Sequence, residues 1–266
     1  MKSCFSTLGC PDWTAEQVTS CVSRLGFAGI ELRGLEGEMF LPDSPHLQPG
    51  SEFLRQLSSA GCQVVDLGSS ACFARGGEAL DECNAFVKTA QAAGCGMVRV
   101  FGGQLPQGAD HETAARDMAP LLRQACEFAA PRDVAIGLET HDAWCRGDEC
   151  ALILDAVDHP ALGIVWDAHH SYRHGEAPRD TVAAIGERIV HVHLKDGLWS
   201  DKGPNYRLLG EGDVPLLEIL QVLKDQGYGG YLSLEWEKKW HPQLEAPEVA
   251  FPQYVSKLDE LLGCLA

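Results

Sequence analysis

Basic residues are scarce in this chain. Its 266 residues include 21 Lys and Arg against 38 Asp and Glu, which gives a formal net charge of −17 at pH 7. The basic residues are scattered, whereas binding to nucleic acid or to an anionic membrane needs them gathered on one face. We therefore expect neither nucleic acid nor a membrane as a partner. An anionic small molecule would need local positive groups to offset the overall field.

Long apolar runs and paired cysteines are also missing. No segment approaches the roughly 20 apolar residues that span a bilayer. The first residues, MKSCFSTLGCPDW, are too short an apolar stretch and too polar for a signal peptide, so we expect a cytoplasmic protein. The eleven cysteines include no C-x-x-C pair, which argues against a zinc ribbon or a thioredoxin-like motif. We expect small buried thiols that stay reduced.

Short β-type segments alternate with longer amphipathic segments along the chain. Strands are expected at 2–8, 28–33, 63–68, 97–101, 134–139, 162–167, 189–194 and 231–236. Helices are expected at 14–25, 50–60, 78–93, 110–130, 147–157, 178–186, 214–226 and 253–264. Eight such pairs predict an α/β protein, a single (β/α)8 TIM barrel over residues 1–266.

A doubly wound open sheet is the alternative fold. No G-x-G-x-x-G follows the first expected strand, and this disfavours the dinucleotide-binding version of that sheet. Near the other end, the segment 241–253 carries three prolines. They predict an extended arm that leads into the last helix, so that 241–266 forms a C-terminal arm and helix.

Four polar residues end four successive apolar segments in the second half of the chain. Glu139 ends VAIGLE, Asp167 ends LGIVWD, His193 lies in IVHVHL, and Glu235 lies in YLSLEW. Side chains alternate across a strand, and in each segment the polar residue shares its face with residues suited to a barrel interior. We expect all four side chains to meet at the carboxyl end of the barrel, where active sites of this fold lie.

These residue types predict a site for one divalent metal ion. Three carboxylates and one imidazole, without a thiolate, favour a fairly hard ion, for which Mn²⁺ is our prediction, with Mg²⁺, Co²⁺ or Zn²⁺ as alternatives. Of the four ligand assignments, that of Glu235 is the weakest, because Glu237 has the same strand parity. His191 is expected to be an interior histidine or a group that orients His193.

Charged residues with inward parity also occur in the earlier strands. They are Glu31 and Arg33 in the second strand and Arg99 in the fourth. The first interpretation of the three is a structural ion-pair network beneath the site. The alternative is contact with the substrate, for which Arg33 is the best placed because it lies at the end of its strand.

The chain resembles the sugar phosphate isomerase/epimerase family of the xylose isomerase-like TIM barrels. The resemblance covers almost the whole length through STLGCPDWT, LGFAGIELRG, LETHD, WDAHH, HVHLKD, LGEGDVP and GYGGYLSLEWE. Within these, D-x-x-H (Asp167 to His170) and H-x-H (His191 to His193) are fairly specific together. By contrast, the stretches DLGSS, VRVFGG and GLWSDKGPNYR lack the additional histidines that the related endonuclease IV group needs for three metal ions.

The resemblance implies an enzyme with one Mn²⁺-type ion held by Glu139, Asp167, His193 and Glu235. Its substrate would be a small sugar or polyol, with His170 touching the substrate or a bound water. Our hypothesis is that Glu139 and Glu235 transfer the proton next to a carbonyl through a metal-bound enediolate, which makes the enzyme an isomerase or an epimerase. We also expect the substrate to contact His141, Lys195 and Arg33.

Several alternatives stay open at this level. The same enediolate could expel a β-hydroxyl, which would make the protein a lyase of the inosose dehydratase type. A metal-dependent hydrolase and a non-catalytic sugar-binding barrel are less favoured. The segment 196–213 is expected to be a loop that closes over the substrate, and the candidates for binding a phosphate are Lys202, Arg207, Lys238 and Lys239. A homo-oligomer is an open possibility, because barrel helices are exposed.

Overall fold

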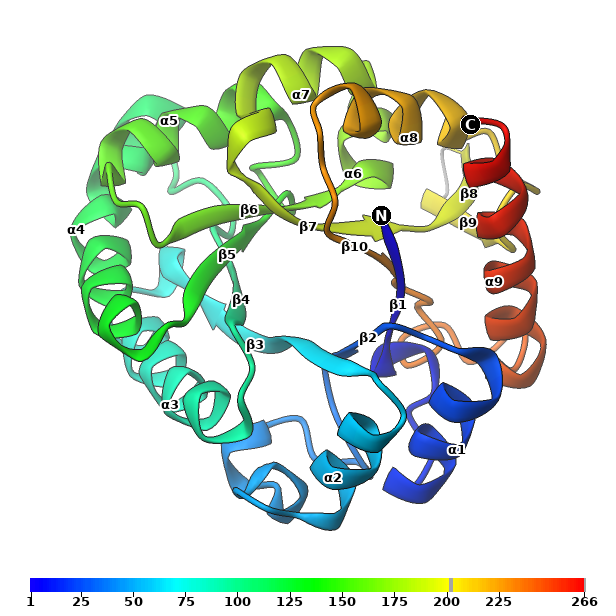
Figure 1. The fold of residues 1–266 in the computed structure, drawn as a ribbon. Coiled ribbons are helices and arrows are strands. Elements are labelled where there is room, and N and C mark those ends of the chain that lie inside the picture. Colours follow the sequence, from blue (N-terminus) through cyan, green and yellow to red (C-terminus); the bar gives the residue numbers. More distant parts are fainter. Residues whose placement is uncertain (201–202, 266) are drawn as a thin grey trace.

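Eight parallel strands close into a barrel in the computed structural model, which describes residues 1–200 and 203–265. The neighbours around the ring are β1-β10-β7-β6-β5-β4-β3-β2, and β1 pairs with both β10 and β2. Figure 1 looks along the barrel and shows the strands as a ring with the helices outside. The predicted (β/α)8 barrel is confirmed, and the open sheet is wrong. The barrel strands are β1 (Lys2–Ser6), β2 (Gly29–Leu32), β3 (Gln63–Cys72), β4 (Met97–Phe101), β5 (Ala135–Glu139), β6 (Leu162–Asp167), β7 (Ile189–Leu194) and β10 (Tyr231–Leu234).

Helices on the outside cover the barrel. Their ends follow local capping chemistry: Thr14 accepts from the backbone N–H of Gln17 at the start of α1, and Gly26 closes the same helix at φ 70°. The helices are α1 (Ala15–Leu25), α2 (Glu52–Ser59), α3 (Gly77–Ala93), α4 (His111–Ala129), α5 (Gly147–Val157), α6 (Ala168–Arg173), α7 (Pro178–Ile185), α8 (Leu216–Asp225) and α9 (Pro247–Gly263).

Several segments differ from the prediction. Strand β3 continues to Cys72 instead of ending at 68, and the six-residue helix α6 follows β6 directly. Helix α9 begins at Pro247, so the extended arm expected over 241–253 is wrong from 247 onward. The physical reason is that Pro247 occupies the first helical turn, where a missing N–H costs nothing.

The segment expected to be a loop at 196–213 contains an antiparallel hairpin. Strands β8 (Asp196–Ser200) and β9 (Gly203–Arg207) pair with each other and lie outside the barrel sheet. Asp196 fastens the base of this hairpin: its carboxylate accepts backbone N–H groups from Gly197, Gly210, Gly212 and Val214 at 2.8–3.2 Å. A Cβ on Gly212 would lie 2.0 Å from Asp196 Oδ1, so glycine is required there.

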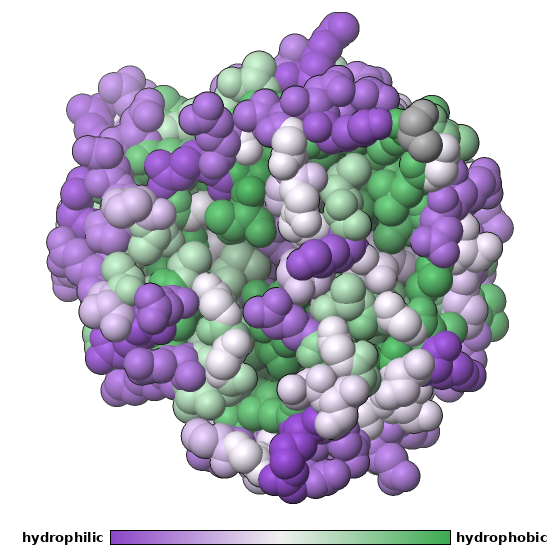
Figure 2. Space-filling view, viewed as in Figure 1, coloured by the Kyte–Doolittle hydropathy of each residue, from purple (hydrophilic) through white to green (hydrophobic). Residues whose placement is uncertain are grey.

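Apolar side chains fill the space between strands and helices, including buried Trp144, Trp166 and Trp236. Hydrophilic residues gather over the outer helices on the face in Figure 2, with hydrophobic residues toward the middle. Within the described part of the chain, every helix is too short or too polar to cross a lipid bilayer.

Candidate metal and active site

The four predicted ligands converge at the carboxyl ends of their strands. Glu139 is the last residue of β5, Asp167 ends β6, His193 lies near the end of β7, and Glu235 follows β10. One ligand atom from each residue lies within 4.8 Å of the others, and all four side chains are buried. Asp167 and His193 are direct register partners on adjacent strands. Strand parity therefore predicted this group correctly, while the roles of its members remain predictions.

The donor atoms of this group fit a divalent cation. His193 Nδ1 is buried and has no hydrogen-bond partner among the described residues, while Glu139 Oε2 lies 3.1 Å from Arg99 Nε and Asp167 Oδ2 lies 2.7 Å from Lys195 Nζ. A buried ring nitrogen without a partner is costly, and with three carboxylates gathered beside it the group suits a positive ion. Oxygen donors with one imidazole suit Mn²⁺, Mg²⁺, Co²⁺ or Zn²⁺.

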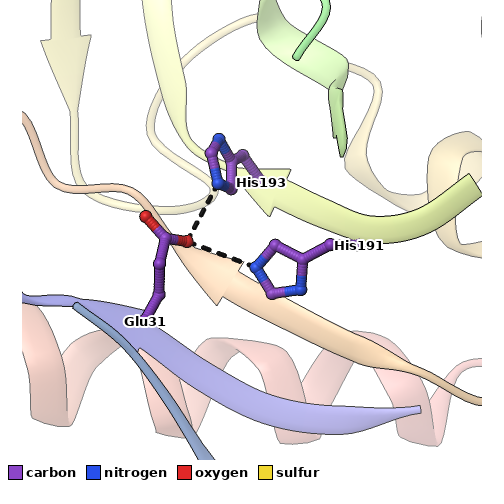
Figure 3. Close-up of side chains that lie close together, drawn as sticks. All are labelled: Glu31, His191 and His193. Atoms are coloured by element: carbon purple, nitrogen blue, oxygen red, sulfur yellow. Dashed lines mark hydrogen bonds and ion pairs between the residues drawn. The ribbon is translucent and has the colours of Figure 1, made fainter. Parts of the chain in front are cut away.

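Glu31 sets the orientation of the histidine ligand. One oxygen of Glu31 accepts hydrogen bonds from His193 Nε2 at 2.9 Å, His191 Nε2 at 3.2 Å and Ser233 Oγ at 3.1 Å. Figure 3 shows both rings from β7 turned toward this oxygen. Because Nε2 of His193 donates to Glu31, its Nδ1 is left for a metal. Burial opposes ionisation of Glu31, but the two histidines outweigh it and hold the pKa well below its ordinary value.

His191 does not orient His193 directly. The two rings are perpendicular, with centroids 5.4 Å apart, and each bonds to Glu31 instead. Glu31, His191 and His193 also form a group with ligand atoms within 4.8 Å of one another. This is a second geometric candidate for a metal, although its shared oxygen is already occupied by three donors.

Lys195 contacts both of the glutamates that parity left equivalent, so the choice between them depends on which one lies with the other ligands. Its buried ammonium lies 2.7 Å from Asp167 Oδ2, 2.6 Å from Glu235 Oε2 and 2.8 Å from Glu237 Oε1. Among the described residues Glu235 belongs to the four-ligand group, whereas Glu237 contacts Lys195 and the hydroxyl of Tyr206. The geometry thus favours Glu235 as the ligand.

The two glutamates of the group differ in their electrostatic surroundings. Burial would raise the pKa of Glu139, but Arg99, with Nε 3.1 Å from Oε2, and His193 hold it well below its ordinary value. Burial dominates at Glu235 and raises its pKa to about 7 in spite of Lys195. One carboxylate is therefore firmly ionised, and the other can exchange a proton near neutral pH.

Two histidines border the site on the side of β5 and α6. His170 Nδ1 lies 2.8 Å from the carbonyl oxygen of Thr140, which leaves Nε2 directed toward the site, 3.7 Å from Asp167 Oδ2. His141 is half-buried, and its ring lies 4.9 Å from that of His170. Burial lowers the pKa of His170 well below its ordinary value, so this ring is neutral. Both positions are consistent with the predicted substrate contacts.

The ion-pair network expected for the earlier strands is only partly present. Arg99 pairs with Glu139, and Glu31 bonds the histidines. Arg33, by contrast, has no carboxylate within 4.0 Å among the described residues; Nη2 donates to Ser70 Oγ at 2.9 Å. The structural ion pair, our first interpretation, is therefore wrong for Arg33.

Sequence reasoning missed two contacts that shape the site. Thr140 Oγ1 accepts from the backbone N–H of Asp167 at 2.8 Å and ties the ends of β5 and β6 together. Tyr206, from the hairpin, packs 5.5 Å from the ring of His169 and covers this side of the site. The only available signal was the Tyr in a segment already expected to cover the substrate.

Two of the four candidates for phosphate binding are engaged by neighbouring groups. Lys238 Nζ donates to the carbonyl oxygens of Pro242 and Leu244, and Arg207 Nη1 donates to Asn205 Oδ1 at 2.6 Å. These contacts are within their own segments. Lys202 lies outside the described residues.

A family model described as "xylose isomerase-like TIM barrel" matches residues 21–253. The chain belongs to this family. Its curated relatives include 3-oxo-isoapionate decarboxylase of Pectobacterium atrosepticum, 28% identical over 134 residues, which cover 50% of this chain and 47% of the relative. L-ribulose 3-epimerase of Methylomonas sp. is 27% identical over 146 residues, 53% of this chain and 48% of the relative.

The matches span about half the length of these curated relatives. Others are named fructoselysine 3-epimerase, inosose isomerase and inosose dehydratase, so these named relatives are enzymes. Among solved structures, IOLI protein with a binding zinc atom aligns with a TM-score of 0.83 and 18% identity, covering 100% of this chain and 99% of that chain. Such low identity shows the fold alone.

Proposed function

We propose that the protein is a divalent-metal-dependent isomerase or epimerase of a keto-sugar, a sugar phosphate or a related polyol. The observation that carries this proposal is the buried group of three carboxylates and one histidine within 4.8 Å of one another. Two of its glutamates lie on strands separated by β6 and β7 in the barrel, so they approach the site from different sides. The names of curated epimerases and isomerases support the same reaction class.

The metal would be held by Glu139, Asp167, His193 and Glu235. When bound, a divalent ion supplies Lewis-acid polarisation of a carbonyl oxygen and lowers the pKa of the neighbouring C–H. We propose Mn²⁺ because carboxylates dominate the donor set. The zinc atom in IOLI protein keeps Zn²⁺ as the alternative.

The chain's own carboxylates would move the proton. One glutamate takes the proton from the carbon next to the carbonyl, which gives an enediolate. Return of a proton to the neighbouring carbon isomerises the sugar, whereas delivery to the same carbon from the opposite face by the other glutamate epimerises it. A positioned acid or base contributes roughly 10²–10⁴-fold to the rate.

Other side chains would stabilise negative charge on the substrate oxygens. The ammonium of Lys195 is buried and already lies among carboxylates, so it stays charged. Nε2 of His170 faces the site while its Nδ1 is fixed by the Thr140 carbonyl. Preorganised donors of this kind act on developing charge without further reorganisation.

A lyase of the inosose dehydratase type is the second candidate. A relative of that name matches 106 residues at 26% identity. The same abstracted proton would give an enediolate that expels a β-hydroxyl, and Glu235 could protonate the leaving oxygen. Isomerisation and dehydration share every residue up to that last step.

Hydrogen exchange in D₂O tests the proposal. The protein is incubated with keto-sugars, sugar phosphates and inososes, with Mn²⁺ or with chelator, and C–H loss is followed by NMR. We expect deuterium entry next to the carbonyl only with metal, and the product separates isomerase, epimerase and dehydratase. Tight metal binding without exchange in any compound would refute the proposal and favour a hydrolase or a binding role.

A further inference from the structure

Two arginines from different strands meet over one glycine beside the metal group. Gly68 in β3 has no side chain, and a Cβ there would lie 2.9 Å from Arg33 Cδ and 2.9 Å from Arg99 Nη2. Both arginines are buried, with Arg33 8% and Arg99 1% exposed. Two adjacent buried guanidinium groups repel each other unless anions compensate them.

Only one of the two arginines has an anionic partner. Arg99 Nε lies 3.1 Å from Glu139 Oε2, and Arg99 Nη1 donates to the carbonyl oxygen of Ser69 at 2.9 Å. Arg33 Nη2 donates to Ser70 Oγ, and Nη1 makes only a 3.5 Å contact with the carbonyl oxygen of Gly68. No carboxylate of the described residues lies within ion-pair distance of Arg33.

Arg33 keeps N–H groups that no described residue accepts, and it lies at the carboxyl end of the barrel. A guanidinium has five N–H donors in a planar fork, and Arg33 places two of them on protein acceptors. Nε has no hydrogen-bond partner among the described residues, and it is not fully buried. Arg33 directly follows β2, at the end of the barrel where Glu139 and Glu235 lie.

We propose that Arg33 binds a carboxylate of the substrate, so that the substrate is a keto-sugar acid. This inference rests on the proposed function and narrows its substrate class. A carboxylate matches the guanidinium fork with two parallel hydrogen bonds. It also supplies the negative charge that Arg33 lacks among the described residues.

A carboxylate fits this position better than a phosphate. One unpaired guanidinium neutralises a monoanion, whereas a phosphate dianion would retain a negative charge inside a protein of net charge −17. Of the three buried Lys and Arg side chains among the described residues, Lys195 lies among three carboxylates and Arg99 pairs with Glu139. Arg33 is the one of these three that is left for an anionic group.

Three compounds that differ only at their last carbon test the proposal. D-fructose carries a terminal CH₂OH, D-fructuronate a carboxylate, and D-fructose 6-phosphate a phosphate at that carbon. Their dissociation constants from Mn²⁺-loaded protein are measured by calorimetry for wild type, Arg33→Gln, Arg33→Lys and Arg179→Gln. Arg179 is the control because its side chain is 76% exposed on α7 and its loss changes the net charge equally.

Wild type should bind D-fructuronate roughly 10- to 100-fold more tightly than D-fructose, which corresponds to a charge-assisted bidentate contact. Arg33→Gln should abolish this preference, Arg33→Lys should keep part of it, and Arg179→Gln should keep all of it. Thermal unfolding of each variant shows whether it is folded. The comparison of D-fructuronate with D-fructose in the wild-type protein tests the proposal even where a variant does not fold.

Equal binding of the acid and the neutral sugar to wild type would overturn the inference, as would a preference that survives Arg33→Gln. Tighter binding of the phosphate than of the acid would overturn the assignment to a carboxylate. Deuterium exchange in the same samples tests the reaction separately. If the protein prefers D-fructuronate through Arg33 but catalyses no deuterium exchange, the inference is supported and the proposed function is not. If it catalyses exchange without that preference, the proposed function is supported and the inference is not.

Discussion

Replacing Glu31 with Gln should weaken metal binding without removing a ligand. One oxygen of Glu31 accepts three hydrogen bonds, including that from His193 Nε2 at 2.9 Å. Gln keeps the shape and one acceptor but loses the charge that fixes the imidazole tautomer. Partners of this kind are worth about 10- to 100-fold in metal affinity, or about 1.4 to 2.7 kcal/mol. We expect an increase of this size in the dissociation constant for Mn²⁺.

Calorimetric titration with Mn²⁺ measures the effect, and circular dichroism shows that each variant is folded. Ser233→Ala is the matched control, because it removes one hydrogen bond from the same oxygen without touching a histidine, and we expect a smaller change. Unchanged affinity in Glu31→Gln would refute the reasoning. If His191→Gln weakened binding strongly while Glu139→Gln did not, the metal would lie in the group of Glu31, His191 and His193 instead.

Three further changes have definite expected outcomes. Glu235→Gln should lower metal-dependent deuterium exchange by roughly 10²–10⁴-fold while Glu237→Gln lowers it less, and the reverse order would exchange their roles. Burial and the nearby Glu31 raise the pKa of Asp66 in the folded protein. The folded state therefore keeps this proton at pH values where the unfolded state has lost it, so wild-type stability falls as the pH rises above the ordinary pKa of an aspartate. Urea unfolding from pH 5 to 8 should show Asp66→Asn gaining stability over wild type; parallel curves would contradict this. Gly68→Ala should cost about 1–3 kcal/mol in thermal unfolding, because its Cβ crowds both arginines, and an unchanged midpoint would disprove that crowding.

Strand parity was sufficient to predict the metal group, because parallel barrel strands alternate regularly and end at a common edge. Glu139, Asp167 and His193 follow directly from this rule. Parity alone could not rank Glu235 against Glu237, since both carboxylates contact Lys195 and, among the described residues, only Glu235 lies with Glu139, Asp167 and His193. Roles within the group lie beyond what parity can predict.

Contacts between strands distant in sequence were harder to predict. The arginine that pairs with Glu139 depends on the order of the strands around the barrel. Strands β4 and β5 are neighbours, so Arg99 pairs with Glu139, whereas Arg33 follows β2, which lies between β1 and β3. The hairpin was missed because Gly203 and Pro204 interrupt its β pattern and its partner strand lies outside the barrel. Helix α6 was missed because its N-cap, Asp167, was assigned only as a ligand.

The Asp196 clamp makes the hairpin an exchangeable module. Four backbone N–H groups at its two ends converge on one carboxylate, so the span between Gly197 and Gly210 is closed independently of what it contains. We expect insertions and substitutions there to leave the barrel register intact, because β8 and β9 lie outside the barrel sheet. Since we predict that this segment closes over the substrate, we also expect specificity to diverge through it, and the same boundaries mark where a foreign hairpin can be grafted.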